Sequence, residues 1–208
     1  SILEWNGYEV EREYYYNDAG LQMKRLGQSV KARYLELVGQ SAEFPDEGYE
    51  GEYIIDIARD LMINRGDNLQ DSDDLTIFTQ AAEKSIFQDI RNSLEKMGLI
   101  FDRYFNEQSL YESGAIELVL DTLKGKDLIY ENEGASWFRA SAVGREQDRV
   151  VIKSTGEPTY RLPDIAYHRD KFERGYDLMV DVLGADHMDA YPDVLAGVEQ
   201  LGYHPDKI

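Results

Sequence analysis

The amino-acid sequence predicts an α/β fold in which parallel core strands are interrupted by long insertions. Three segments have the aromatic and aliphatic composition of strands, and they cover residues 9–16, 99–105 and 178–183. Helical segments and one group of short β-segments separate these strands along the chain. This order indicates an α/β core with excursions, because strands that alternate with helices favour a parallel sheet.

Each predicted helix has apolar residues that recur every three to four positions, which is the spacing of one buried helical face. The predicted helices cover residues 21–38, 53–63, 75–97, 114–124, 162–172 and 190–201. Asp73 or Asp74 precedes the third helix as a candidate N-terminal cap, and Gly98 follows it. Pro163 falls in the first turn of the fifth helix, where a missing amide hydrogen is tolerated.

Short β-segments at residues 128–130, 137–139 and 149–152 indicate a small β-containing insertion after the second strand. The order of elements then divides the chain into five parts. We expect a core part over 1–21, a helical insertion over 22–74, a core helix and strand over 75–106, a second insertion over 107–157, and the second half of the core over 158–208.

The composition is strongly acidic, with 41 Asp and Glu residues against 22 Lys and Arg residues and a formal net charge of −19. Such a surface repels phosphate backbones at long range, so we expect no DNA partner and no nucleic-acid binding driven by charge in this stretch. The simplest interpretation of the charge is a solvated acidic surface that keeps the protein in solution.

The chain has no cysteine, which excludes disulfides, thiol nucleophiles and thiolate metal sites. Its three histidines, His168, His187 and His204, are scattered, so we predict no protein-ligated metal and interpret His168 and His204 as structural or surface residues. We also find neither a run of about 18 apolar residues nor a signal peptide, and we therefore expect a cytoplasmic protein without a membrane partner.

Standard phosphate, dinucleotide and nucleophile-elbow motifs are missing from the sequence. Polar residues instead follow the three predicted strands. They are Asn17 and Asp18 after the first, Glu107 after the second, and Asp186 and His187 after the third. If the strands are parallel, these residues lie along one edge of the sheet, where α/β proteins bind their ligands.

Tyr160 and Asp164 lie four residues apart on one predicted helical face, just before the third strand. A guanidinium would suit this pair together with Glu107, because it is planar, always charged, and favours carboxylate forks and aromatic faces. Simpler interpretations exist for every candidate. Glu107 could be a solvated strand end, Tyr160 a packed ring, Asp164 a first-turn acid favoured by the helix dipole, Asn17 and Asp18 a turn, and His187 a loop residue.

Six blocks of sequence occur in an order that resembles arginyl-tRNA synthetases, a family of class I aminoacyl-tRNA synthetases. The blocks are Glu13 to Gly20, Ala32 to Glu36, Gly48 to Ile54, Phe105 to Leu110, Tyr160 to Glu173, and Gly184 to His187. The resemblance implies a Rossmann-like catalytic core broken by two insertions. It also implies an arginine–tRNA ligase that uses L-arginine, ATP with Mg²⁺, and tRNA(Arg) in protein biosynthesis.

By motif position, the resemblance makes Glu107, Tyr160 and Asp164 the residues that hold the arginine side chain. His187 matches a polar position near the amino acid, and Asp186 adjoins it. Asn17 and Asp18 match the motif that follows an early core strand. This part of the site would chiefly select arginine.

The sequence departs from the family by extent. Class I synthetases carry a His-Ile-Gly-His-type motif and a Lys-Met-Ser-Lys-Ser-type motif for ATP, and neither occurs here. We expect the first upstream of Ser1 and the second downstream of Ile208, so that the chain is an internal fragment with no catalytic residue, inactive alone. The alternative is a non-catalytic, synthetase-derived module that senses arginine or binds a partner protein. An unrelated acidic α/β domain is a third possibility.

Overall fold

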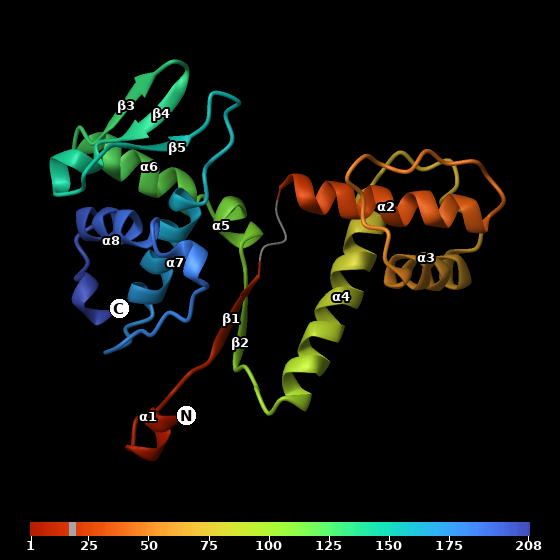
Figure 1. Cartoon of the computed structure of the whole chain (residues 1–208), viewed down its shortest axis with the longest axis horizontal. Coiled ribbons are helices and arrows are strands. Elements are labelled where there is room, and N and C mark those ends of the chain that lie inside the picture. Colours follow the sequence, from red (N-terminus) through yellow and green to blue (C-terminus); the bar gives the residue numbers. More distant parts are fainter. Residues whose placement is uncertain (17–19) are drawn as a thin grey trace. The chain divides into compact units, whose positions relative to one another are not determined.

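The computed structural model describes residues 1–16 and 20–208. The chain divides into two compact units, residues 1–106 and residues 107–208, and each has its own elements (Figure 1). Helices and strands are mixed along the chain, and one sheet is parallel, so the α/β prediction is confirmed.

The first unit contains the parallel pair of strands. After the short helix α1 (Ile2–Trp5), strand β1 (Glu13–Tyr16) pairs in parallel with β2 (Arg103–Asn106), and Tyr15 lies opposite Phe105. The aromatic side chains on these strands contact one another, and Tyr15 and Phe105 stack with ring centroids 6.0 Å apart. Both strands are shorter than predicted, but their parallel pairing agrees with the expected core.

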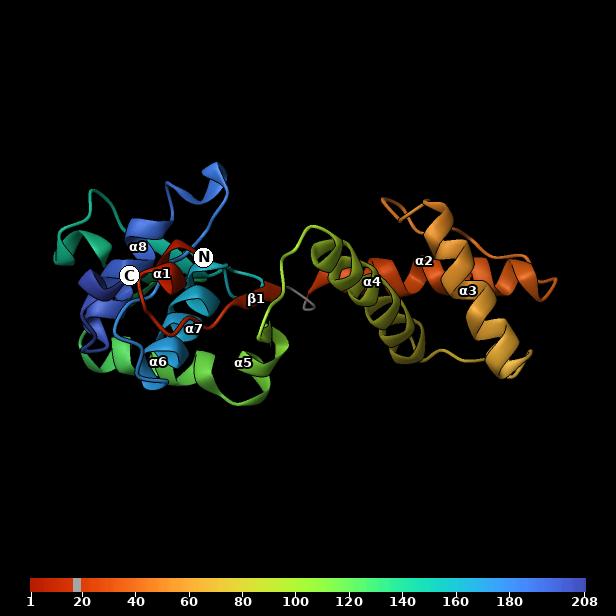
Figure 2. The same cartoon turned by 90° about the horizontal axis from the view of Figure 1, so that it is seen from below.

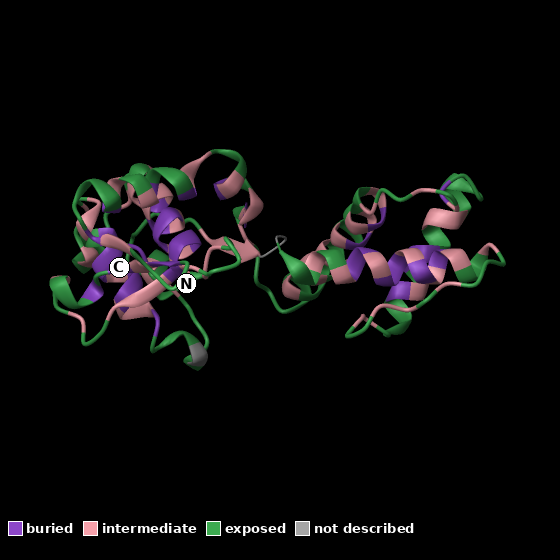
Figure 3. Ribbon diagram, turned by 90° about the horizontal axis from the view of Figure 1, so that it is seen from above, coloured by how far each residue is buried: buried purple, intermediate pink, exposed green. Residues whose placement is uncertain are grey.

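Three helices form the rest of this unit: α2 (Leu21–Leu37), α3 (Glu52–Arg65) and α4 (Thr76–Lys96). Their buried residues face one another, mainly along α2 (Figure 3). Gly27 allows α2 and α4 to approach closely, since a Cβ atom there would lie 2.2 Å from Thr79 Oγ1. The buried Tyr34 hydroxyl donates to the Gly66 carbonyl at 2.5 Å and accepts from the Leu69 amide. The N-terminal cap residue of α4 is Leu75, which forms no side-chain cap hydrogen bond, and the predicted Asp74 lies one residue earlier, where its Oδ1 accepts from the Thr76 amide.

The second unit begins with α5 (Gln108–Glu112) and α6 (Ala115–Gly125), followed by β3 (Ile129–Asn132), β4 (Ala135–Phe138), η1 (Ala140–Val143) and β5 (Arg149–Ile152). These strands form the antiparallel β3–β4–β5 sheet that the sequence predicted as short β-segments.

The chain then continues through α7 (Arg161–Glu173), η2 (Ala185–His187), α8 (Tyr191–Gln200) and η3 (Pro205–Lys207). Helix α7 packs against both α6 and α8 (Figure 2). Gly197 makes the α7–α8 contact close, because a Cβ atom there would lie 2.4 Å from Ile165 Cδ1. Leu162 and Ile165 of α7 and Val194 and Val198 of α8 are almost fully buried.

The prediction of a third strand at residues 178–183 is wrong for this structure. The segment has no strand ladder, and its apolar side chains are largely exposed, with Val182 at 93%. Composition favours a strand, but a strand also needs a hydrogen-bonding neighbour. Here the Met179 amide donates instead to the Lys207 carbonyl in η3, at 2.7 Å. Consequently Asp186 and His187 follow an irregular segment and lie in η2.

Candidate functional site

Four of the predicted site residues lie in the second unit, at the ends of helices. Glu107 directly precedes α5 and forms no side-chain cap hydrogen bond there, and Tyr160 directly precedes α7. Asp164 lies in the first turn of α7, where it is partly buried, and His187 ends η2. Tyr160 is 55% exposed, so the interpretation of this residue as a packed ring does not hold.

The Asp164 carboxyl group is the electrostatic centre of this region. Its pKa is raised to about 6, chiefly by burial; the negative charge of Glu107 also raises it, while His168, His187 and Lys171 act in the opposite direction. Glu107 and His187, which come from different elements, therefore both influence the charge state of Asp164.

The Asp164 carboxylate has no hydrogen bond or ion pair with any residue that the structure describes. Its backbone is well fixed, because its amide donates to the Tyr160 carbonyl at 3.0 Å and its carbonyl faces His168 Nδ1 at 2.7 Å. A partly buried carboxylate beside a second carboxylate attracts a cation, since the cation would relieve both desolvation and repulsion. The region thus has the negative charge and the unpaired Asp164 carboxylate that a binding site for a cationic group requires.

The exposed Tyr160 ring contacts a guanidinium of the chain itself. The Arg161 guanidinium lies over this ring, with Cζ 5.0 Å from the ring centroid. The ring therefore already stacks with a guanidinium supplied by the chain, in the geometry of a cation–π interaction.

The side chains of three predicted residues are not described by the structure. Residues Asn17 and Asp18 belong to the stretch that is not described, and the same holds for the side chain of Asp186. The expected edge formed by three strand ends is reduced to the end of β2, which Glu107 follows directly in sequence.

A second polar cluster, centred on Asp181, was not predicted from the sequence. Asp181 Oδ2 lies 2.7 Å from His168 Nε2 and accepts from the Tyr191 hydroxyl at 2.8 Å, and Asp181 Oδ1 accepts from Lys171 Nζ at 2.5 Å. His168 and Lys171 are buried. Burial opposes ionisation of Asp181, but the hydrogen bond from His168 and the charge of Lys171 lower its pKa overall. The same carboxylate, together with burial, raises the pKa of Tyr191.

Part of this cluster had a signal in the sequence. His168 and Lys171 follow Asp164 by four and seven residues, so all three share one face of α7. Asp181 had no such signal, because it lies in the segment that was predicted as a strand.

A third carboxylate, Asp193 of α8, is enclosed by three arginines. Its oxygens lie 2.7 Å from Arg149 Nε, 3.2 Å from Arg161 Nε and 3.3 Å from Arg145 Nε. Asp193 is only 1% exposed. The cluster connects β5, the loop before it, α7 and α8, so its position in the fold indicates a structural role.

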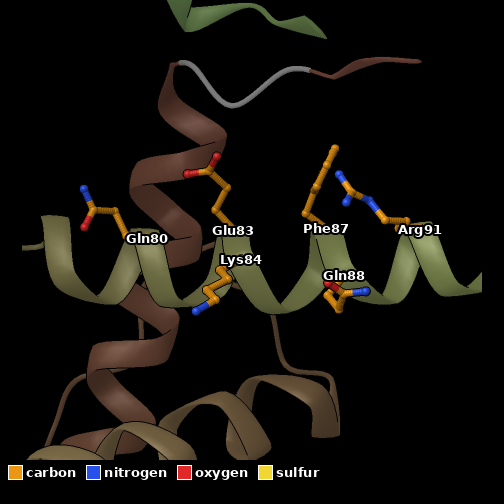
Figure 4. A pocket seen from close by; sticks show the side chains of 6 residues that line it. All are labelled: Gln80, Glu83, Lys84, Phe87, Gln88 and Arg91. Carbon is orange, nitrogen blue, oxygen red and sulfur yellow. The ribbon is translucent and has the colours of Figure 1, made fainter. Parts of the chain in front are cut away.

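Other features of the described residues add no second candidate. A shallow pocket of about 250 Å³ on α4 is lined by Gln80, Glu83, Lys84, Phe87, Gln88 and Arg91 (Figure 4), and it contains none of the predicted residues. In the described part of the chain, no three His, Cys, Asp or Glu side chains group as metal ligands. None of the described helices is long and apolar enough to cross a membrane.

Comparison with known proteins identifies the family. No protein-family model matches the chain. An arginine–tRNA ligase from Desulfotalea psychrophila is 55% identical over all of this chain, and one from Chlorobaculum parvum is 52% identical over all of it. The chain spans 38% and 39% of the length of these two relatives.

Solved structures agree. A protein from Campylobacter jejuni, described as an arginyl-tRNA synthetase, superposes with a TM-score of 0.85 at 35% identity, over 97% of this chain and 44% of that one. The arginyl-tRNA synthetase from Plasmodium falciparum shares the fold, with a TM-score of 0.68 at 15% identity, over 96% of this chain and 34% of that one. The fold is thus that of a class I aminoacyl-tRNA synthetase. Within this class, the chain belongs to the arginyl-tRNA synthetase family and corresponds to a segment of its members.

Proposed function

We propose that this chain is the arginine-selecting part of an arginine–tRNA ligase, the longer protein that we call the parent. The parent would activate L-arginine with ATP and Mg²⁺ to arginyl-adenylate, with release of pyrophosphate, and transfer the arginyl group to tRNA(Arg). The names of relatives that match the full chain support this activity. We also propose for this chain the five-part division into core parts and insertions that the sequence predicts.

One observation carries the assignment of the site: the partly buried Asp164 carboxylate is influenced by the negative charge of Glu107 and forms no ion pair with a described residue. Arginine supplies the missing group, because its guanidinium offers five donors in a planar fork and stays charged at every relevant pH. We assign Glu107 and Asp164 as its carboxylate partners. Tyr160 would contribute its phenol or ring, and His187 would lie near the amino-acid moiety. We also assign Asn17, Asp18 and Asp186 to the arginine site, on the basis of their motif positions alone.

The proposed site discriminates by charge. Citrulline has a neutral urea in place of the guanidinium, and it would leave the partly buried Asp164 carboxylate without the ion pair that arginine offers. Rejection of citrulline should therefore be strong. The site residues of this chain bind and orient arginine, and the chemistry of adenylate formation rests on positioning and charge stabilisation, with no covalent enzyme intermediate.

Arginine-dependent ATP–pyrophosphate exchange by the parent, with tRNA(Arg) present, tests the function. We expect exchange with arginine and none with citrulline. Glu107→Gln and Asp164→Asn should each reduce kcat/KM for arginine by about 30-fold or more, since removal of one partner of a buried charge pair costs roughly 2–5 kcal/mol. Full arginine selectivity in either variant would refute the site assignment.

Matched controls are available on the same elements. Glu112→Gln changes an exposed carboxylate of α5, and Asp170→Asn changes a carboxylate of α7 that pairs with Arg174. Both should retain the wild-type kcat/KM. We also propose that the isolated chain does not aminoacylate, and arginylation by the purified chain would contradict this. A folded parent that binds arginine without any exchange would favour the sensor module.

A further inference from the structure

The two nitrogens of the His168 ring both face oxygen atoms that can only accept hydrogen bonds. Nδ1 lies 2.7 Å from the Asp164 carbonyl oxygen, and Nε2 lies 2.7 Å from Asp181 Oδ2. A neutral imidazole has one N–H and one bare nitrogen, so it would place a lone pair against an oxygen in one of these contacts. Only the doubly protonated imidazolium satisfies both.

Asp181 is built to hold this cation. It receives hydrogen bonds from Lys171 and Tyr191 in addition to His168, so both of its oxygens are occupied by donors. An ionised carboxylate is an acceptor only, and three donors from two helices stabilise its charged form. The cluster therefore fixes both the orientation and the charge of the His168 ring, while burial keeps water away from it.

The cation lies where it affects the proposed arginine site. Among the charges that act on Asp164, His168 has the largest effect, and it favours the ionised carboxylate against the cost of burial. His168 also binds the Asp164 carbonyl, so it fixes the turn of α7 from which that carboxylate projects.

We propose that Asp181 and His168 are positioning residues for arginine recognition: Asp181 holds His168 as an imidazolium, which keeps the Asp164 carboxylate oriented and ionised for the incoming guanidinium. This inference rests on the proposed function for its biological meaning. The charge state of His168 is a separate statement that can be tested without arginine.

Titratable and charged groups from several surrounding elements influence the ionisation of Asp164 and Asp181, and thus the pH dependence of arginine binding. Glu107 at the start of α5 and His187 of η2 act on Asp164, and Lys171 of α7 acts on both Asp164 and Asp181. Tyr191 of α8 reaches Asp181, and the pKa of its hydroxyl is raised, so it remains a neutral donor at physiological pH. The pKa of Asp164, about 6, lies close to the lower end of a working range of about pH 6.5 to 8.5, so a change in the charge of His168 alters the ionisation of Asp164 most near pH 6.5.

The first test is nitrogen NMR of the histidine side chains in the ¹⁵N-labelled chain, near pH 7. The His168 resonances should show both ring nitrogens protonated in the wild type, and one bare nitrogen in Asp181→Asn. Asp170→Asn, the matched α7 control, should leave the His168 ring unchanged. A neutral His168 in the folded wild-type chain would overturn the inference, whatever the parent does with arginine.

The second test is calorimetric titration of arginine into the parent at about pH 6.5 and pH 8.5. Asp181→Asn and His168→Gln should weaken arginine binding roughly threefold more at the lower pH, because loss of the cation raises the pKa of Asp164 and protonates it there. An equal loss at both pH values would show a merely structural role and refute the proposal. A parent that shows the imidazolium but binds no arginine refutes the proposed function alone. Should Asp181→Asn fail to fold, His168→Gln and the wild-type NMR spectrum still decide the question.

Discussion

Asp193 and Asp164 are two carboxylates of the same unit, and they differ in whether residues of the chain form ion pairs with them. Asp193 is surrounded by the guanidinium groups of Arg145, Arg149 and Arg161. Asp164 has no ion pair with any described residue, although its surroundings desolvate it enough to raise its pKa to about 6. Arginines of the chain thus neutralise Asp193, whereas Asp164 has no ion pair with a described residue.

This difference separates a structural carboxylate from a binding one. Charges buried without a partner are costly, so a carboxylate that remains unpaired in a folded protein needs another reason to be retained. The carboxylate–guanidinium pair that closes the Asp193 cluster is the same interaction that we propose for arginine at Asp164. The contrast can be tested, because replacement of the two residues should change stability in opposite directions.

The largest effect is expected at Asp193. Asp193→Ala leaves three guanidinium groups around an empty position, and it should lower the free energy of unfolding by about 3–5 kcal/mol. Urea denaturation of the purified chain, followed by circular dichroism, measures this change. A loss below about 1 kcal/mol would mean that the three arginines are solvated well enough to need no central carboxylate, and the comparison would fail.

Asp164 should behave in the opposite way. Its folded pKa of about 6 lies above the ordinary value of 3.8, so the folded state holds the proton more tightly. Stability from this group is therefore present at low pH and is lost as pH rises through about 4 to 6. Asp164→Asn removes that loss, and the variant should be more stable than wild type by roughly 1–3 kcal/mol near pH 7.5.

The control for this expectation is the pH dependence itself. Near pH 4 the wild-type Asp164 is protonated, so the gain from Asp164→Asn should disappear there. Thermal unfolding of both proteins at the two pH values gives the result directly. A variant that is less stable than wild type at both values would mean that the Asp164 carboxylate is structural, like that of Asp193.

Much of the fold could be predicted from the sequence, because the deciding signals were local. The helical periodicity and the following glycine located α2 and α4 to within a residue or two, and Asp74, one residue before the cap position Leu75, accepts from the Thr76 amide. The third strand failed for the opposite reason. Apolar composition at residues 178–183 is a local signal, whereas a strand depends on a neighbour that local sequence cannot supply.

The candidate site also has a part that local sequence could predict and a part that it could not. Glu107 and Asp164 could be named from motif position and charge, and in the structure the charge of Glu107 raises the pKa of Asp164. The partners that set their environment are distant in sequence: Asp181 reaches back to His168, and Asp193 reaches Arg145 across 48 residues. These contacts join α7 to the irregular segment 178–183 and α8 to the loop before β5, and no periodicity specifies them. The stacking of the Arg161 guanidinium on the Tyr160 ring could not be predicted from the sequence either.

Arg161 connects the two carboxylate regions, and it provides the smallest and sharpest test. Its Nε atom donates to Asp193 Oδ2, while its guanidinium lies over the Tyr160 ring. Arg161→Gln leaves Arg145 and Arg149 on Asp193, so the loss in unfolding free energy should be only about 1 kcal/mol. The same urea titration measures it, with Arg145→Gln as the more exposed control and an expected loss of about 0.5 kcal/mol. A cost for Arg161→Gln as large as that of Asp193→Ala would show that the Asp193 cluster depends on one arginine, and that its other two add little.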